Sequence, residues 1–156
     1  MNIIKTYGLE VLKSKNFRKE RKFIQHGNVT TYEHSVRVAK MSVRLAKFLR
    51  IKADMRSLVR GALLHDYFLY DWHIEKTSSG LHGFSHAATA LSNAKRDFDV
   101  NAVESDIIAR HMFPLNIRPP KYKESWLVCA ADKLCAAEET AHTFSRAIKR
   151  MCAVFA

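Results

Sequence analysis

The chain has 156 residues, of which 47% are hydrophobic and 26% are charged, and its formal net charge at pH 7 is +11. These values are typical of one globular domain whose core needs no disulfide bonds. No apolar run in the sequence approaches the roughly 18 residues needed to span a membrane, and the N-terminus lacks the pattern of a secretory signal. We therefore expect a cytoplasmic protein with no membrane partner.

The positive charge would attract nucleic acid, a membrane surface or a phosphorylated small molecule alike, because all three respond to a positive field. No cluster of aromatic residues alternates with the basic ones, so no specific nucleic-acid site is indicated and we expect a solvated basic surface. The cysteines are odd in number and match no zinc-finger spacing, so we expect reduced thiols at Cys129, Cys135 and Cys152.

The N-terminal part predicts helices, because only five glycines and three prolines interrupt the whole chain. Residues 3–13 have a weak amphipathic pattern and the basic segment 13–22 follows, so we expect two short helices that cover a main bundle. Thr30 and Glu33 then form the reciprocal capping pair that begins a helix, predicted from about Thr31 to Arg50. Spacing of three or four residues predicts an inward stripe of His34, Val38, Met41, Leu45 and Phe48.

The next predicted helix begins after Asp54, a plausible N-cap, and ends near Tyr70. It carries the adjacent pair His65 and Asp66 inside an apolar run, with both side chains pointing the same way as the core residues. A buried carboxylate must be paired, hydrogen-bonded or bound to metal, because burying it alone costs several kcal/mol. Residues 71–84 form an irregular connection, which in a compact domain is more often a functional loop than filler.

Two further helices are expected to place histidines inward. Ser85 is expected to cap the first of these, which puts His86 in its first turn, four residues after His82. Asn101 with Glu104 predicts the second, a short helix whose inward line ends at His111.

Prolines 114, 119 and 120 exclude helix from the loop that follows. The last strong helix is predicted from about Tyr122 to Thr140, with Asp132 on a line beside its apolar face. The inward residues are expected to be Trp126, Leu127, Ala130, Leu134 and Ala137. Residues 141–156 are expected to form a short packing helix, with a dimer surface as the alternative, so an oligomer stays possible.

Six polar residues therefore lie on apolar helical faces: His34, His65, Asp66, His86, His111 and Asp132. Each alone has an ordinary explanation as a buried residue with a hydrogen-bond partner. Together they offer only imidazole nitrogen and carboxylate oxygen, a donor set that suits Mn, Fe, Co, Ni, Zn or Mg. A single carboxylate can bridge two such ions and hold a shared water.

The His65-Asp66 doublet, preceded by a helical His34 and followed by a late helical Asp132, resembles the HD superfamily over residues 28–140. The resemblance implies one all-α domain over residues 1–156, with a core of about five helices plus short terminal helices. His86 and His111 are similar to the extra ligands of the binuclear branch.

That branch implies two divalent transition-metal ions, with Fe, Mn, Co or Ni favoured and Zn or Mg possible. It also implies that Asp66 bridges the two ions and positions the water. One ion would be held by His34, His65, Asp66 and Asp132, and the other by Asp66, His86 and His111. His82 competes with His86, which the Ser85-capped turn favours.

The resemblance implies a metal-dependent phosphohydrolase or phosphodiesterase for a small, nucleotide-like phosphomonoester or phosphodiester. The alternatives are a di-iron oxygenase with the same ligand order and a non-catalytic, metal-binding regulatory module. The doublet is not followed by Gly-Lys and no Gly-Tyr-Pro occurs, which argues against cyclic-dinucleotide hydrolysis. Asp71 is a candidate to protonate the leaving group. The candidate phosphate-binding cations are Arg37, Arg110, Lys121 and Lys133.

Overall fold

The computed structural model describes residues 2–26, 28–70 and 82–154, with side chains described for all of these except 26, 82–85 and 145–154. In chain order the elements are α1 (Ile3–Lys13), α2 (Lys15–Lys19), the 3₁₀ turn η1 (Glu20–Lys22), β1 (Ile24–His26), β2 (Val29–Thr30), α3 (Thr31–Phe48), α4 (Met55–Leu64), α5 (His82–Asp97), α6 (Ala102–Arg110) and α7 (Lys123–Val154). The predicted all-α class is confirmed. The antiparallel β1–β2 pair was not predicted from the sequence.

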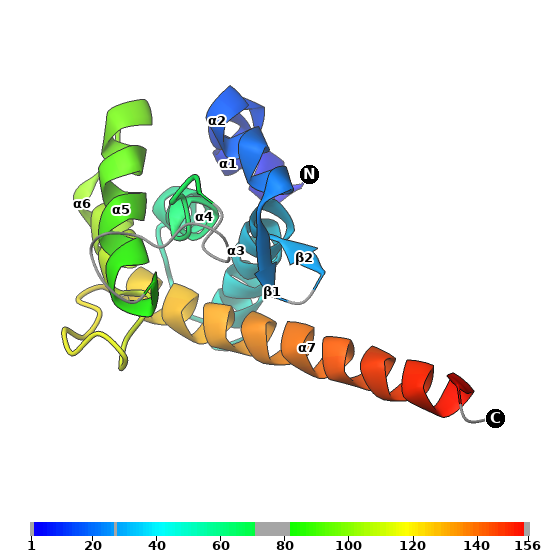
Figure 1. The fold of residues 1–156 in the computed structure, drawn as a ribbon. Helices are drawn as coiled ribbons and strands as arrows, with labels where there is room; N and C mark the ends of the chain where they lie inside the picture. Colours follow the sequence, from blue (N-terminus) through cyan, green and yellow to red (C-terminus); the bar gives the residue numbers. More distant parts are fainter. Residues whose placement is uncertain (1, 27, 71–81, 155–156) are drawn as a thin grey trace.

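The helices surround α4, which packs against α1, α3 and α6. In Figure 1, α5 and α6 lie on one side of α4, the N-terminal helices lie on the other, and α7 passes beneath them all. Close approach of α4 to α6 requires Gly61, because a Cβ at this position would lie 2.5 Å from Cδ1 of Ile107. The core at this junction includes the fully buried Leu58, Leu63 and Val128.

Local capping starts three of the helices as the sequence predicts. The Thr30 hydroxyl accepts from the Glu33 backbone N–H while the Glu33 carboxylate accepts from the Thr30 N–H, which completes the capping box. Asn101 and Glu104 repeat this arrangement at α6. Asp54 caps α4 by accepting from two backbone N–H groups. These caps orient the helices that carry the histidines.

The end of α4 was predicted wrongly, since the helix stops at Leu64 and not near Tyr70. Leu69 adopts the left-handed φ of 63°, and the side chain of Asn93 donates to the backbone carbonyls of Tyr67 and Phe68 at 3.1 and 3.0 Å. Carbonyls bound in this way from outside no longer continue a helix. The His65-Asp66 doublet therefore lies in the turn after α4.

Helix α5 begins at His82, so Ser85 is not its N-cap and His86 lies in the second helical turn. The cap was inferred from residue type alone, whereas capping needs extended backbone at that residue. Residues 82–84 have helical backbone instead. The prediction for His86 as an inward residue survives this shift, because its side chain is only 4% exposed.

The predicted inward faces of α3 and α7 were partly wrong. Phe48 is 83% exposed at the end of α3, beyond the neighbours that cover the rest of the stripe. On α7, Trp126 and Leu134 are about half exposed, Ala130 and Ala137 face solvent, and only Leu127 of the predicted line is buried. The buried line is instead Val128, Asp132, Cys135 and Glu139. Carboxylates that face other polar groups across a bundle rotate a helix away from the orientation its apolar residues alone would favour.

The short C-terminal helix was also a wrong prediction, because α7 runs unbroken for 32 residues. Its C-terminal half extends past the other helices (Figure 1), and Phe144 there is 69% exposed. Within the described residues, none of the helices combines the length and the apolar character that crossing a membrane requires. Cys129 and Cys135 are free thiols, as expected.

An ionic cluster around a buried arginine, here named the Arg60 cluster, joins α1, α4 and α6. The Arg60 side chain is 1% exposed, and its Nε donates to Glu104 at 2.8 Å. A second nitrogen donates to Glu10 and a third to the Asp99 carbonyl at 2.9 Å. Each carboxylate in this cluster therefore meets the guanidinium, which satisfies the charges within the chain.

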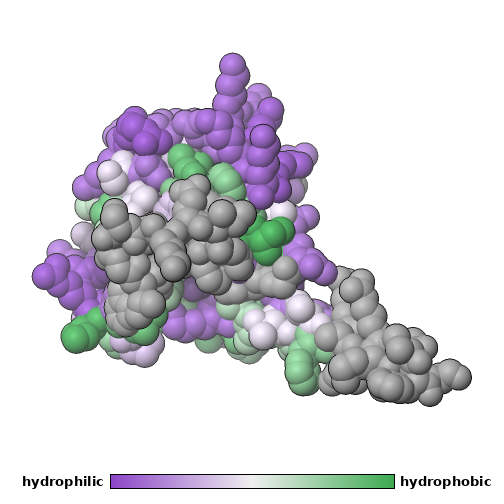
Figure 2. All heavy atoms as spheres, in the orientation of Figure 1, coloured by the Kyte–Doolittle hydropathy of each residue, from purple (hydrophilic) through white to green (hydrophobic). Residues whose placement is uncertain are grey.

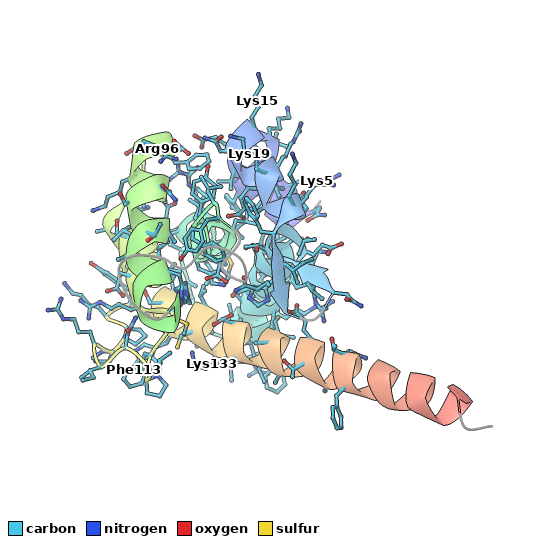
Figure 3. All side chains as sticks on the ribbon, viewed as in Figure 1. Lys5, Lys15, Lys19, Arg96, Phe113 and Lys133 are labelled. Carbon is cyan, nitrogen blue, oxygen red and sulfur yellow. The ribbon has the colours of Figure 1, made fainter. Side chains whose placement is uncertain are left out.

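Basic side chains gather on the N-terminal helices. Figure 2 shows hydrophilic residues over the end of the molecule formed by α1 and α2. In Figure 3, Lys5, Lys15 and Lys19 extend from these helices away from the bundle. This agrees with the expected solvated basic surface.

Candidate metal centre

Six buried polar residues converge from five parts of the fold. His34 lies on α3, the His65-Asp66 doublet follows α4, and His86 lies on α5. His111 is the C-cap of α6 and Asp132 lies on α7. None of the six is more than 9% exposed. The structure thus brings together all six residues that the sequence analysis singled out.

Asp66 lies at the centre, and its two carboxylate oxygens face different imidazoles. Oδ1 lies 3.3 Å from Nε2 of both His86 and His111. Oδ2 lies 3.4 Å from Nε2 of His65 and 3.9 Å from Nε2 of His34. Two groups of potential metal ligands result, and Asp66 belongs to both. This is the arrangement that a bridging carboxylate requires.

Asp132 faces the first of these groups. Its Oδ1 lies 3.0 Å from Nε2 of His34 and 3.6 Å from Nε2 of His65. Nε2 of His86 lies 2.9 Å from Nε2 of His111 in the second group. The two groups therefore have a carboxylate in common, and the first has a second carboxylate beside it.

Backbone carbonyls fix the orientation of two of the rings. Nδ1 of His65 donates to the Ala62 carbonyl at 2.8 Å, and Nδ1 of His111 donates to the Ile108 carbonyl at 2.9 Å. A neutral imidazole with its proton on Nδ1 presents an unprotonated Nε2, which is the form that binds metal. The tautomer follows from these hydrogen bonds.

This donor set fits a metal ion. The unprotonated Nε2 atoms of His65 and His111 face the carboxylate of Asp66, so acceptors point at acceptors. Nε2 of His65 and Oδ1 of Asp66 are buried and have no hydrogen-bond partner among the described residues. Buried acceptors that converge in this way require a cation between them, either protons or metal.

Without a metal, protons take that place on the histidines of the first group. Burial opposes the charged form of His34, but hydrogen bonds with Asp132 and Glu139 outweigh it and raise its pKa to about 9. Burial likewise opposes protonation of His65, but the negative charges of Asp66 and Asp132 raise its pKa well above the usual value. Both rings stay attractive sites for positive charge.

The carboxylates show the matching shifts. Burial would raise the pKa of Asp66, but the charge of His65 and the bond to His111 hold it well below its usual value. Burial also opposes ionisation of Asp132, but the hydrogen bond from His34 and the charge of His65 lower its pKa. The pKa of His111 is lowered by burial, so this ring stays neutral and available as a ligand.

Two further residues orient the cluster, and sequence reasoning missed both. Glu139 is 1% exposed and its Oε2 accepts from Nδ1 of His34 at 2.9 Å. Its spacing of seven residues from Asp132, two helical turns, was an available signal. Gln25 donates from Nε2 to Oδ2 of Asp66 at 2.6 Å, and no sequence pattern marked it because it lies on the unpredicted strand β1. Such partners fix ligand orientation in metal sites.

The four candidate phosphate-binding cations have protein partners in the structure. Arg37 pairs with Glu138 at 3.3 Å and lies 3.5 Å from Glu139. Arg110 pairs with Asp106 at 2.7 Å.

The two candidate lysines differ in where they lie. Nζ of Lys121 lies 5.4 Å from the centre of the Tyr122 ring. Nζ of Lys133, which Figure 3 labels on α7, donates to the backbone carbonyl of His111 at 2.9 Å. Lys133 is thus the candidate cation that contacts a member of the cluster directly.

Two candidates lie outside the described residues. Asp71 belongs to the segment 71–81. The backbone of His82 begins α5, but its side chain is not among those described. A ligand role for His82 therefore stays a prediction. For His86, the structure places Nε2 3.3 Å from Oδ1 of Asp66.

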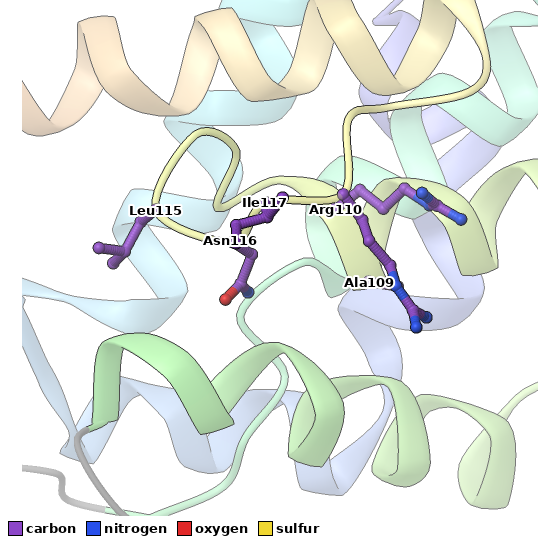
Figure 4. Close-up of a pocket in the computed structure, with 6 residues that line it drawn as sticks. Ala109, Arg110, Leu115, Asn116 and Ile117 are labelled. Atoms are coloured by element: carbon purple, nitrogen blue, oxygen red, sulfur yellow. The ribbon is translucent and has the colours of Figure 1, made fainter.

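A pocket of about 430 Å³ lies in the loop between α6 and α7 (Figure 4). Its lining contains none of the six cluster residues, and Arg110, which it does contain, is paired with Asp106. The exposed Leu115 and Ile117 make much of this pocket apolar. We therefore assign the chemistry to the buried cluster and not to this pocket.

A helical bundle whose buried histidines and aspartates could hold metal defines the class of this protein as a helical metal-binding domain. A family model described as HD domain matches residues 31–137, more than half of the chain. The chain belongs to the HD domain family, whose members are mostly metal-dependent phosphohydrolases. Searches of curated proteins and of solved structures found no match.

Proposed function

We propose that the protein is a phosphohydrolase that uses two divalent metal ions to cleave a small phosphomonoester or phosphodiester, nucleotide-like in character. One observation carries this proposal: the two oxygens of Asp66 face two different groups of imidazoles, at 3.3 to 3.9 Å. A lone structural carboxylate would need one partner on each oxygen, whereas four rings around one carboxylate suit a bridge.

The six cluster residues would hold the ions, and Asp66 would be common to both. When bound, such ions lower the pKa of a shared water and neutralise charge on the phosphoryl oxygens. Gln25 holds the Asp66 carboxylate in one orientation, and Glu139 does the same for His34. Lys133 is the best placed of the candidate cations to attract a phosphate, because its ammonium group already lies against the His111 backbone.

The test is metal content followed by hydrolysis. Wild type, Asp66→Ala and His86→Ala would be purified without chelator and loaded with Mn²⁺, Co²⁺, Ni²⁺ or Fe²⁺, and bound metal would be counted per chain. We expect two ions in wild type, about none in Asp66→Ala and one in His86→Ala. Asp99→Ala serves as a matched control, because Asp99 is an exposed aspartate outside the cluster.

The loaded proteins would then be assayed on p-nitrophenyl phosphate, bis-p-nitrophenyl phosphate and nucleoside monophosphates. Hydrolysis that follows the metal content of the variants supports the proposal. Iron-specific loading with oxygen uptake in place of hydrolysis would support the di-iron oxygenase. Two bound ions without any turnover would support a regulatory module, and no bound metal would refute all three.

A further inference from the structure

Glu20 is a fully buried carboxylic acid that has no role in the cluster described so far. It begins η1 and its side chain is 0% exposed. Neither of its carboxylate oxygens has a hydrogen-bond partner among the described residues. An unpaired carboxylate in a protein interior costs several kcal/mol, so its position demands a compensating charge or proton.

The sequence around Glu20 makes its burial more telling. Glu20 is the one acidic residue in a run of lysines and arginines. The two side chains before it and the two after it face solvent. These exposed neighbours are Arg18, Lys19, Arg21 and Lys22. A surface glutamate in such a run would pair with one of these cations at little cost. Glu20 instead points into the bundle, away from every nearby base.

The residues that act on Glu20 belong to the candidate metal centre. Burial raises its pKa well above the usual value, the negative charge of Asp66 raises it further, and the charge of His65 opposes this. Asp66 and His65 are thus near enough to act on Glu20 electrostatically, yet neither forms a hydrogen bond to it. The geometry agrees, because η1 packs against α3, which carries His34, and Gln25, five residues after Glu20, donates to Oδ2 of Asp66 at 2.6 Å.

Metal ions bound at the site would supply the positive charge that Glu20 lacks. The buried carboxylates around the cluster are Asp66, Asp132, Glu139 and Glu20. Ionised together they carry a charge of −4, and two divalent ions carry +4, which makes bound ions the largest local charges in the site. Of these four carboxylates, Arg37 forms an ion pair with Glu139, at 3.5 Å, and its other described ion pair is with Glu138.

We propose that Glu20 is a positioning carboxylate of the metal centre, which holds a water ligand of the bound ions and helps to balance their charge. This inference rests on the proposed two-metal site. It predicts that Glu20 contributes to metal affinity and that it is a burden on the folded protein when no metal is bound. A purely structural glutamate would have the opposite effect on the metal-free protein.

The experiment compares Glu20→Gln with Glu104→Gln, each loaded with Mn²⁺. Glu104 is the matched control, because it is also 0% exposed but is paired with Arg60. Mn²⁺ affinity would be measured by calorimetry, the bound ions by electron paramagnetic resonance, and Tm with and without Mn²⁺. We expect Glu20→Gln to weaken Mn²⁺ binding by about 10- to 100-fold and to alter the resonance spectrum. Its metal-free Tm should equal or exceed that of wild type.

Glu104→Gln should lower Tm equally with and without Mn²⁺ and leave the Mn²⁺ affinity within about twofold of wild type, since only its pairing with Arg60 is lost. Wild-type Mn²⁺ affinity in Glu20→Gln would overturn the inference and leave the two-metal function intact. A metal-free Glu20→Gln protein that unfolds would also overturn it, because a structural role would then be shown. Three ions in wild type and two in Glu20→Gln would make Glu20 a direct ligand instead. A wild-type protein that binds no Mn²⁺, Co²⁺, Ni²⁺ or Fe²⁺ would refute the proposed function together with the inference.

Discussion

The bundle buries two charged clusters, and they satisfy their charges in different ways. In the Arg60 cluster, a guanidinium meets the carboxylates of Glu10 and Glu104 and the carbonyl of Asp99. In the candidate metal centre, carboxylates face imidazole nitrogens, and acceptor atoms remain without partners. Arg60 and Glu104 are as buried as the six residues of the candidate metal centre, whereas Glu10 is 62% exposed.

The difference separates structure from function. A buried charge that finds its counter-charge within the chain needs nothing else, and it tells us only how the helices are joined. A buried group of acceptors needs protons or a metal ion between its members, so it marks a candidate binding site. Burial of polar residues alone would therefore have marked both clusters as sites, and only their partners distinguish them.

The largest expected effect is on the metal centre. Asp66→Asn keeps the size of the side chain but removes the bridging charge, so we expect Mn²⁺ binding and phosphoester hydrolysis to fall below detection. The metal-free protein should also lose some stability, because the charge of Asp66 raises the pKa of His65 in the folded state. Calorimetry, hydrolysis assays and urea unfolding would check this. Two tightly bound ions in Asp66→Asn would contradict the bridge.

Substitutions in the Arg60 cluster should lower the stability of the protein and should not act through metal binding. Arg60→Met leaves Glu104 buried without its counter-charge, and we expect the free energy of unfolding to fall by about 3 to 5 kcal/mol. Urea unfolding with and without Mn²⁺ would measure it. The double variant Arg60→Met with Glu104→Leu should recover much of the loss. Rescue of Arg60→Met by Mn²⁺ would show that the two clusters are not independent.

A smaller loss of metal affinity is expected at Glu139, whose carboxylate orients the ligand His34 through the ring nitrogen that faces away from Asp66 and Asp132. Glu139→Gln weakens the hold on Nδ1 of His34, so Mn²⁺ affinity should fall by about tenfold, within the range typical of such partners. Glu138→Gln is the matched control, because Glu138 is the adjacent residue, pairs with the same Arg37 and is 53% exposed. Calorimetry on both variants would decide. Equal losses would point to the charge of Arg37 and not to the orientation of His34.

The smallest effect concerns a carboxylate satisfied near the surface. Hydrogen bonds from Arg96 lower the pKa of Asp97 below 3.8 despite partial burial, with help from Tyr67 and Asn16. Since the folded pKa is depressed, its contribution is present above pH 3.8 and is lost as the pH falls towards the folded value. Asp97→Asn should cost about 1 kcal/mol at pH 6 and progressively less as the pH falls below 3.8. Urea unfolding across this range would test it, and a difference that does not vary with pH would count against an ionic origin.

The sequence by itself determined the all-α class, the starts of three helices and the identity of six residues that meet in the cluster. Capping depends on atoms within about four residues of one another, so Thr30 with Glu33 and Asn101 with Glu104 could be recognised locally. The six cluster residues stood out because imidazoles and carboxylates are costly on an apolar helical face.

Tertiary structure decided what these local patterns could not. The rotation of α7 that buries Glu139 in place of Trp126 depends on which groups face it from α3. The burial of Glu20 and the approach of Gln25 to Asp66 both occur where η1 and β1 pack against α3. Burial is a property of neighbours far apart in the chain, and charge balance is a property of the whole cluster. Neither burial nor charge balance can be predicted from the spacing of residues along one helix.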